Sequence, residues 1–361
     1  MTSPLAAIIT SFAICFLMLP VIIRYSLKKN IVDNPGRRKV HKRITPSMGG
    51  IAIFFGFLIA GLVWIDLSNW TEVRTIFIAL LMIFLVGARD DLVPTQPVTK
   101  IVVQVIAAFI LIVVYDLRLK SMYGVAGIYD IPVWTSYLIT IFTVVVITNS
   151  YNLIDGIDGL AGTVGSIALA ALGTWFLLTN DQVYAILTFS MLGALLAFLV
   201  FNWEPSKVFM GDTGAMVVGM MLAIAVIHFI DRNYTLAAGN AYRFSGSVSP
   251  ALSILVIPLA DTLRVFIIRI ANQQSPFKAD KRHIHHNILR LGYSHASATI
   301  LLGTIQLGFI GLAIAFRQAN DNFVIAGLVL LAFLLSMALA RISRKPPAMK
   351  EPQRRAAQQT G

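Results

Sequence analysis

The stretch PLAAIITSFAICFLMLPVIIR, residues 4–24, holds no charged side chain before its last residue. About 20 apolar residues in a helix span the hydrocarbon core of a bilayer, so this stretch predicts a transmembrane helix. Comparable apolar runs follow at about 48–66, 73–88, 101–116, 133–149, 160–178, 183–201, 214–230, 248–270, 296–316 and 322–340. The sequence therefore predicts an all-α, polytopic integral membrane protein with about 11 transmembrane helices.

The overall composition agrees with such a protein. Of 361 residues, 57% are hydrophobic and only 13% are charged, with a mean hydropathy of +0.78, which excludes an ordinary soluble domain. We expect residues 1–341 to form a single transmembrane domain and residues 342–361, with their prolines and basic residues, to form a disordered cytoplasmic tail. The one cysteine, Cys15, excludes a disulfide framework and a cysteine-ligated metal cluster.

Basic residues fall mostly on alternate loops. If the loop after the first span is placed inside, 23 of the 29 lysines and arginines lie inside and six lie outside. The positive-inside rule then places the N-terminus outside and the C-terminus in the cytoplasm. This asymmetry accounts for most of the net charge of +12, and the basic residues match no nucleic-acid-binding motif. We therefore expect a lipid bilayer around the chain and no nucleic-acid partner.

Five aspartates gather on the face predicted to be cytoplasmic: Asp90, Asp91, Asp155, Asp158 and Asp212. Singly, each has a structural explanation, as the end of a span, a helix N-cap or a turn former. Together they would repel one another by a few kcal/mol per close pair, as an order of magnitude. An ionisable group at membrane depth also indicates function by default. The pattern predicts that these carboxylates surround a divalent cation.

Carboxylate ligands without thiolates favour Mg²⁺, with Mn²⁺ as a substitute, over Zn²⁺. Mg²⁺ indicates phosphate chemistry, and the same face carries basic residues suited to phosphate: Lys42, Arg43, Lys100, Lys207, Arg264 and the cluster Lys281-Arg282-His283-Ile284-His285-His286. For the three histidines, a zinc site and a plain surface position are the alternatives to phosphate binding or proton transfer. The predicted active site therefore lies on the cytoplasmic face and acts on phosphorylated substrates.

Five motifs occur in order between about His41 and Gly292. They are Thr45-Pro-Ser-Met-Gly-Gly50; Gly87-Ala-Arg-Asp-Asp91 with Lys100 and Gln104; Asn149-x-x-Asn152-x-x-Asp155-Gly-Ile-Asp158-Gly-Leu-Ala; Asn202-x-x-Pro205-x-x-Val-Phe-Met-Gly-Asp212-Thr-Gly; and His283-Ile-His-His286. In these motifs the sequence resembles the polyprenyl-phosphate N-acetylhexosamine-1-phosphate transferases. These are multi-span membrane enzymes that use Mg²⁺ to move a sugar 1-phosphate from a UDP-sugar to a polyprenyl phosphate.

The resemblance implies a role for each motif residue. Asp212 corresponds to the principal Mg²⁺ ligand, with Asp91 as a second metal ligand. The implied catalytic residues are Asp90, Asp91, Lys100, Asp155, Asp158, His283, His285 and His286. The implied substrate-binding residues are Lys42, Asn149, Asn152, Asn202 and Arg264. The transmembrane domain would then be catalytic, with a UDP-N-acetylhexosamine and polyprenyl (undecaprenyl) phosphate as partners, and a homodimer is compatible with the sequence.

The histidine motif distinguishes two branches of this family. It runs His-Ile-His-His-Asn here, whereas the phospho-N-acetylmuramoyl-pentapeptide transferases have three consecutive histidines followed shortly by an acidic residue. The motif therefore resembles the undecaprenyl-phosphate N-acetylglucosaminyl 1-phosphate transferase branch, multi-pass enzymes of the bacterial inner membrane. That branch implies undecaprenyl-diphospho-N-acetylglucosamine and UMP as products, in the first membrane step of an O-antigen, common antigen or teichoic-acid linkage.

Two alternatives stay open at this point. Within the family, the muramoyl-pentapeptide branch is the alternative. In a different class, a secondary transporter also places carboxylates in a multi-span protein, but its sites lie near the bilayer midplane on broken helices, whereas these motifs lie at span ends. For the reaction, we expect direct attack of the lipid phosphate on the UDP-sugar, with a covalent aspartyl-phosphate through Asp90 or Asp91 as the alternative.

Overall fold

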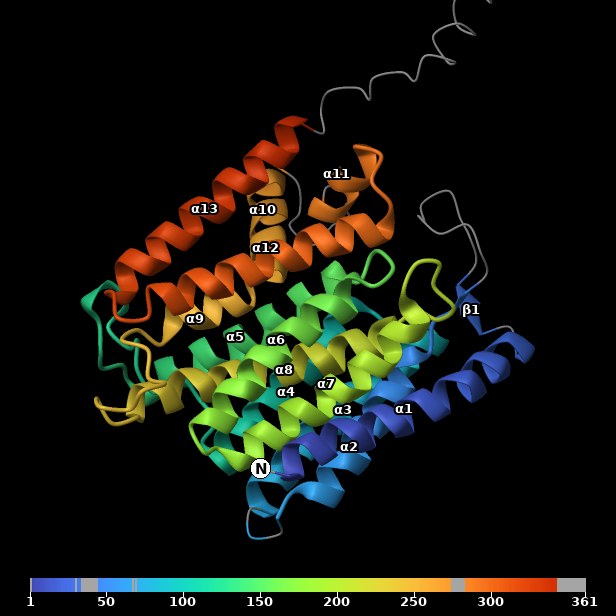
Figure 1. Ribbon diagram of the computed structural model, residues 1–361, viewed down its shortest axis with the longest axis horizontal. Helices are drawn as coiled ribbons and strands as arrows, with labels where there is room; N and C mark the ends of the chain where they lie inside the picture. The colour runs from blue at the N-terminus through green and yellow to red at the C-terminus, as the bar shows by residue number, and fades with distance from the viewer. Residues whose placement is uncertain are drawn as a thin grey trace, which may run out of the picture.

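The computed structural model describes residues 2–29, 31–33, 45–66, 68, 70–273 and 283–342, and these are mostly helical (Figure 1). The helices are α1 (Thr2–Lys28), α2 (Gly49–Trp64), α3 (Trp70–Leu92), α4 (Pro97–Tyr115), α5 (Val133–Ile154), α6 (Leu160–Leu178), α7 (Gln182–Asn202), α8 (Gly211–Thr235), α9 (Val248–Ile254), α10 (Val256–Ala271), α11 (Ile284–Arg290), α12 (His295–Ala315) and α13 (Asp321–Ile342). Strands β1 (Val32–Asp33) and β2 (Thr45–Pro46) pair antiparallel, and η2 (Val125–Gly127) is a short 3₁₀ helix.

Nine of the described helices are long and apolar enough to cross a membrane: α1, α3 to α8, α12 and α13. The pair α9 and α10 adds a tenth if the two form one bent span. Helix α2 is also apolar, but its 16 residues fall short of the ~20 that a straight span requires. Each of the 11 predicted runs therefore lies in a helix or a helix pair, and the chain is a polytopic, helical membrane protein.

The run predicted as one span at 248–270 is bent by 85° between α9 and α10. Pro258 lies in the first turn of α10. If α9 and α10 were one straight helix, Pro258 would have no N–H to donate and its ring would clash with the carbonyl four residues earlier. That carbonyl, of Ile254, instead accepts a hydrogen bond from Nε2 of Gln306 on α12, at 2.8 Å. The predicted run is therefore helical but sharply bent, and a side chain from another helix pairs with the backbone carbonyl at the bend.

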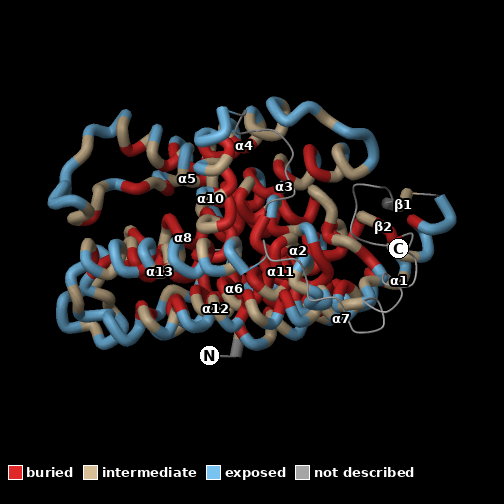
Figure 2. Tube along the Cα trace, turned by 90° about the horizontal axis from the view of Figure 1, so that it is seen from above, coloured by how far each residue is buried: buried red, intermediate tan, exposed pale blue. Residues whose placement is uncertain are grey.

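Helix α8 forms the centre of the bundle. Every residue from Thr213 to Ile227 is buried, and α8 packs against α2, α3, α5 and α6. Figure 2 shows the buried residues concentrated in the middle of the molecule, with exposed residues on the outer helices. Glycines allow the closest approach, at Gly50 of α2 and Gly214 of α8, as small residues do between membrane helices. Surrounding helices therefore shield α8 from lipid along most of its length.

The motif residues come together because successive helices run in opposite directions. Three short links join α3 to α4, α5 to α6 and α7 to α8, and all three lie at the same end of the bundle (Figure 1). The predicted tail beyond Ile342 and the predicted substrate-binding residue Lys42 lie outside the described residues. The assignment of this end to the cytoplasm rests on the loop charges and stays a prediction.

Candidate active site

Three ionisable side chains from three helices meet at this end of the bundle. Lys100, in the first turn of α4, places its Nζ 2.7 Å from Oδ2 of Asp90, near the end of α3. The same ammonium donates a hydrogen bond to Oδ2 of Asp212, in the first turn of α8. All three side chains stay partly exposed, between 13% and 25%. A cation between the two carboxylates offsets their mutual repulsion and leaves them open to a ligand.

Asp91 has a different role from its neighbour, because it caps α8. Its Oδ1 accepts the backbone N–H of Asp212 at 2.8 Å, and its Oδ2 accepts the N–H and the hydroxyl of Thr213. The first N–H groups of a helix have no partner within the helix and carry its positive end. A carboxylate from α3 therefore accepts the first N–H groups of α8 and fixes the position of Asp212. This agrees with a capped start for α8, except that the cap comes from another helix.

Asp158 is held by the segment that follows α7. Oγ of Ser206 donates to Oδ1 of Asp158 at 2.9 Å, and the backbone N–H of Ser206 points to Oδ2 at 3.3 Å. Burial raises the pKa of Asp158, but its hydrogen bonds with His295 and Ser206 outweigh burial and hold that pKa below its ordinary value. Next to it, Gly159 donates its N–H to Oδ1 of Asn202 at 2.9 Å. Hydrogen bonds therefore join the link between α5 and α6 to the end of α7 and the segment that follows it.

Asp155 begins the same link. Burial and, to a smaller extent, the charges of Asp212, Asp91 and Asp158 together raise its pKa to about 7. Asp91 contacts the backbone of Asp212, and Asp158 contacts Ser206 in the motif that carries Asp212. The three motifs that carry the aspartates therefore meet in the structure.

Replacing Asp155 by Asn is expected to stabilise the metal-free protein at pH 8 but hardly at pH 4. A carboxyl whose pKa is raised on folding leaves the free energy of unfolding unchanged below its unfolded pKa near 3.8. Above about pH 7 it lowers the free energy of unfolding by the full amount. The cost at pH 8 is at most about 4 kcal/mol, since one pKa unit corresponds to about 1.4 kcal/mol. Thermal unfolding in detergent with EDTA, at both pH values, measures the difference.

Asp116→Asn serves as the control for this experiment. Burial raises the pKa of Asp116, but the ion pairs with Arg118 and Lys120 together outweigh burial and hold that pKa below the ordinary value. The neutral amide should therefore give no stabilisation at pH 8. Equal stabilisation of the Asp155 variant at pH 4 and pH 8 would show that ionisation of this carboxyl does not destabilise the folded protein.

The histidine motif lies against the link between α5 and α6. Nδ1 of His283 is 2.9 Å from Oδ2 of Asp261 on α10, and the N–H of Ile284 donates to the same carboxylate. His285 is 2% exposed, and burial lowers its pKa to about 3, so its ring is neutral near pH 7. A Cβ on Gly156 would clash with this ring. The motif thus places one buried neutral imidazole directly beside the aspartate-bearing link.

The remaining predicted residues occupy more varied positions. Nδ2 of Asn149 donates to Oε1 of Gln104 at 2.6 Å, joining α5 to α4. Asn152 is partly buried in the last turn of α5, and Arg264 is partly buried on α10. Asn202 is 3% exposed, and both ends of its amide bind backbone, at Gly159 and Val208. The structure therefore gives Asn202 a scaffolding position instead of an open substrate contact.

The donor set at this site fits a magnesium ion that is bound together with a substrate. Among residues 2–29, 31–33, 45–66, 68, 70–273 and 283–342, no three His, Cys, Asp or Glu side chains enclose a metal position. Mg²⁺ usually needs only one or two carboxylates, because water and substrate phosphates complete its shell. Both oxygens of Asp91 accept hydrogen bonds from α8, and those of Asp90 accept from Thr95 and Lys100. Asp212, which contacts Lys100 through Oδ2, is therefore the donor that fits best.

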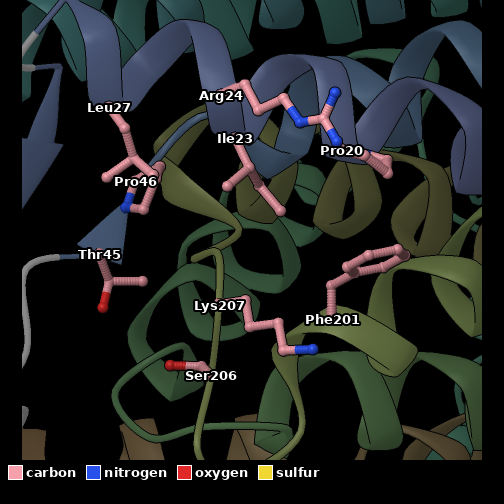
Figure 3. Close-up of a pocket in the computed structure, with 9 residues that line it drawn as sticks. All are labelled: Pro20, Ile23, Arg24, Leu27, Thr45, Pro46, Phe201, Ser206 and Lys207. Atoms are coloured by element: carbon pink, nitrogen blue, oxygen red, sulfur yellow. The ribbon is translucent and has the colours of Figure 1, made fainter.

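A pocket opens beside this site, between α1 and the segment after α7 (Figure 3). Its volume is about 350 Å³. Its lining combines apolar and cationic side chains: Pro20, Ile23, Arg24, Leu27, Thr45, Pro46, Phe201, Ser206 and Lys207. Ser206 belongs both to the pocket and to the hydrogen bonds of Asp158, so the pocket adjoins the aspartate cluster.

Sequence reasoning missed three residues that hold the aspartates in place. Thr95 donates its backbone N–H to Oδ1 of Asp90 at 2.6 Å, and Ser206 and His295 contact Asp158. A threonine in the turn after Asp90 is a detectable turn-forming signal. Ser206 lies 48 residues and His295 lies 137 residues from Asp158. No local pattern reveals contacts over such distances.

Comparison with known proteins agrees with these motifs. The sequence model of glycosyl transferase family 4 matches residues 73–230. A Bacillus subtilis protein named probable undecaprenyl-phosphate N-acetylglucosaminyl 1-phosphate transferase is 30% identical over 344 residues, covering 94% of this chain and 93% of the relative. Undecaprenyl-phosphate α-N-acetylglucosaminyl 1-phosphate transferases of Salmonella typhi and Escherichia coli strain K12 are 28% and 27% identical. The matches cover 92% and 91% of this chain, and 89% and 88% of those relatives.

Proposed function

Because this chain belongs to glycosyl transferase family 4, we propose that it transfers N-acetylglucosamine 1-phosphate from UDP-N-acetylglucosamine to undecaprenyl phosphate. The products are undecaprenyl-diphospho-N-acetylglucosamine and UMP. This reaction is the first membrane step of a cell-envelope glycan, at the cytoplasmic face of a bacterial inner membrane. The names of the relatives support the acceptor and the sugar.

One observation carries the proposal: Lys100 bridges the carboxylates of Asp90 and Asp212 at a partly exposed end of the bundle. Two phosphorylated substrates repel each other, so their transfer chemistry consists mostly of positioning and charge stabilisation. An ammonium beside two carboxylates supplies a positive group for phosphate and negative groups for a metal ion. A transporter site would instead lie near the middle of the spans, and these side chains lie in terminal turns of α3, α4 and α8.

The contacts of the two adjacent aspartates favour direct displacement. A phosphate monoester is largely ionised near pH 7, with a second pKa near 6, so the lipid phosphate can attack the β-phosphorus of the UDP-sugar without an enzyme nucleophile. Oδ1 of Asp90 accepts from Thr95 and its Oδ2 accepts from Lys100, while Asp91 caps α8. Neither carboxylate presents an unoccupied oxygen for a covalent aspartyl-phosphate.

Mg²⁺ would be held chiefly by Asp212. When bound, it supplies neutralisation of the charge that develops on the diphosphate. The chain's own residues hold the reactants: Lys100 lies within reach of a phosphate oxygen beside Asp212, and the Asp155 to Asp158 link lies between the metal donors and the histidine motif. The neutral His285 is suited to donate a hydrogen bond without adding charge.

The proposal predicts metal-dependent labelling of lipid from one donor. Purified protein in detergent is incubated with undecaprenyl phosphate and radiolabelled UDP-N-acetylglucosamine, and label is followed into the organic phase. We expect labelling with Mg²⁺, partial labelling with Mn²⁺, and at least a 100-fold reduction with EDTA, as an order of magnitude for loss of charge stabilisation. UDP-N-acetylmuramoyl-pentapeptide, run in parallel, should give no labelled lipid.

Three results would contradict the proposal. Labelling from the muramoyl donor alone would assign the chain to the other branch. Undiminished labelling in EDTA, after chelation of contaminating metal is verified, would remove the metal from the reaction. Absence of labelling from either donor by folded protein would reject both donors.

A further inference from the structure

The link between α5 and α6, residues 155–159, is held on two opposite flanks. On one flank lies the end of α7, where Asn202 and Ser206 bind Gly159 and Asp158. On the other flank lies the chain from the histidine motif to α12, which contributes His285 beside Gly156. The function proposed above accounts for the motif histidine, but not for the contacts that α12 makes.

The second flank centres on His295, the first residue of α12. Its Nδ1 lies 3.3 Å from Oδ2 of Asp158, and the backbone N–H of Asp158 points to the same nitrogen at 3.3 Å. Four residues later, Oγ1 of Thr299 donates to the carbonyl oxygen of Asp158 at 3.1 Å. The carboxylate, N–H and carbonyl of Asp158 all face the first turns of α12, so α12 fixes both the backbone and the side chain of this aspartate.

The start of α12 is itself anchored to the α7 side. Oε2 of Glu204 accepts the N–H of Ala296 at 2.7 Å, and Ser294 caps the helix through the N–H of Ser297. A carboxylate at a helix N-terminus also interacts favourably with the helix dipole. The link, the segment after α7 and the first turn of α12 thus form a closed set of contacts around Asp158. His295 is the one side chain of this set that contacts both the amide and the carboxylate of Asp158.

We infer that His295 is a positioning residue that holds Asp158 in the orientation required to bind the nucleotide of the donor substrate. The inference rests on the proposed function, and it adds that the link faces the nucleotide of the UDP-sugar. The contact uses Nδ1 alone, and this atom corresponds in position to the amide head of asparagine. Glutamine places its amide near the position of Nε2, where no contact with Asp158 is made.

The test compares His295→Ala, His295→Asn and His295→Gln with the wild-type protein. We expect alanine to raise KM for UDP-N-acetylglucosamine about 10-fold, the upper range for loss of one intramolecular hydrogen bond. The kcat and the KM for undecaprenyl phosphate should change less than about twofold, since only donor binding is affected. Asparagine should restore most of the donor KM, and glutamine should not. Thr304→Val, an exposed position on the same helix whose hydroxyl bonds only within α12, should behave as wild type.

A second readout does not depend on activity. Hydrogen exchange of the peptide covering residues 155–160 should accelerate in the alanine and glutamine variants and stay slow with asparagine, because Nδ1 protects the link. Equal rescue by asparagine and glutamine, or a loss confined to kcat, would overturn the inference. If the wild-type protein labels no lipid, the proposed function fails; exchange that is unchanged in the alanine variant would then reject the positioning role separately.

Discussion

Asp212→Asn is expected to reduce lipid labelling at saturating Mg²⁺ by about 10³-fold or more, while the protein is recovered folded in normal yield. The carboxylate of Asp212 is the partner of Lys100 and the metal donor that fits best at this end of the bundle. An amide carries no charge, so it weakens metal binding and leaves Lys100 with only Asp90. Loss of a group that stabilises developing charge typically costs 10²–10³ in turnover, and loss of the metal adds to this.

The variant should still fold because α8 is capped through the backbone of residue 212. The N–H of Asp212 and that of Thr213 donate to Asp91, and asparagine retains both. Asp116→Asn is the matched control: it also neutralises an aspartate in an ion pair, with Arg118, but at the other end of α4. Labelling by the Asp212 variant within tenfold of the wild-type level at saturating Mg²⁺ would argue against a metal-binding role for Asp212.

The sequence predicted most of the fold because bilayer spans have a length and an apolar character that can be read directly. Two runs departed from that expectation for tertiary reasons. Helix α2 has only 16 residues and packs closely on α8 at Gly50 and Gly214. The bend before α10 is stabilised by Gln306, 52 residues away from Ile254 in the chain. Local hydropathy does not reveal a partner at that distance.

The site was predictable as a set of residue types but not as a set of contacts. Burial of a charge is costly, so five aspartates at span ends indicated one shared site, and the mutual effect of Asp155, Asp91 and Asp212 agrees with that expectation. Sequence did not reveal that adjacent carboxylates differ in role. Asp90 faces Lys100, whereas Asp91 faces the first turn of α8, because successive residues on a helix point about 100° apart.

The short apolar helix α2 explains one motif in structural terms. The N–H of Gly49 donates to the carbonyl of Phe209 at 3.0 Å, and that of Gly50 donates to the carbonyl of Met210 at 2.9 Å. These bonds join the start of α2 to the two residues before Gly211 and Asp212. The pair of glycines in Thr45-Pro-Ser-Met-Gly-Gly50 therefore sets the position of the chain that carries the proposed metal ligand.

Gly50→Ala is expected to abolish accumulation of folded, active protein. A Cβ at residue 50 would lie 2.6 Å from Cα of Gly214 and 2.9 Å from the carbonyl oxygen of Met210, and closer still to the amide nitrogen of Gly214. These are backbone atoms of α8 and its approach, so no side-chain rotation can relieve the clash. Overpacking a core typically costs about 1–3 kcal/mol even where side chains can adjust, and here α2 must separate from α8, which also displaces Asp212. Size-exclusion chromatography and lipid labelling measure the two consequences.

Gly311→Ala provides the matched comparison, because it makes the same change within helix α12 where a Cβ would meet nothing within 4 Å. Alanine is favoured over glycine in a helix by up to about 1 kcal/mol, so this variant should elute and label lipid as the wild-type protein does, or melt at a slightly higher temperature. Normal yield and activity of the Gly50 variant would show that α2 and α8 can move apart without disturbing Asp212. A loss confined to activity, with normal elution and melting, would instead make Gly50 a determinant of site geometry alone and refute its role in helix packing.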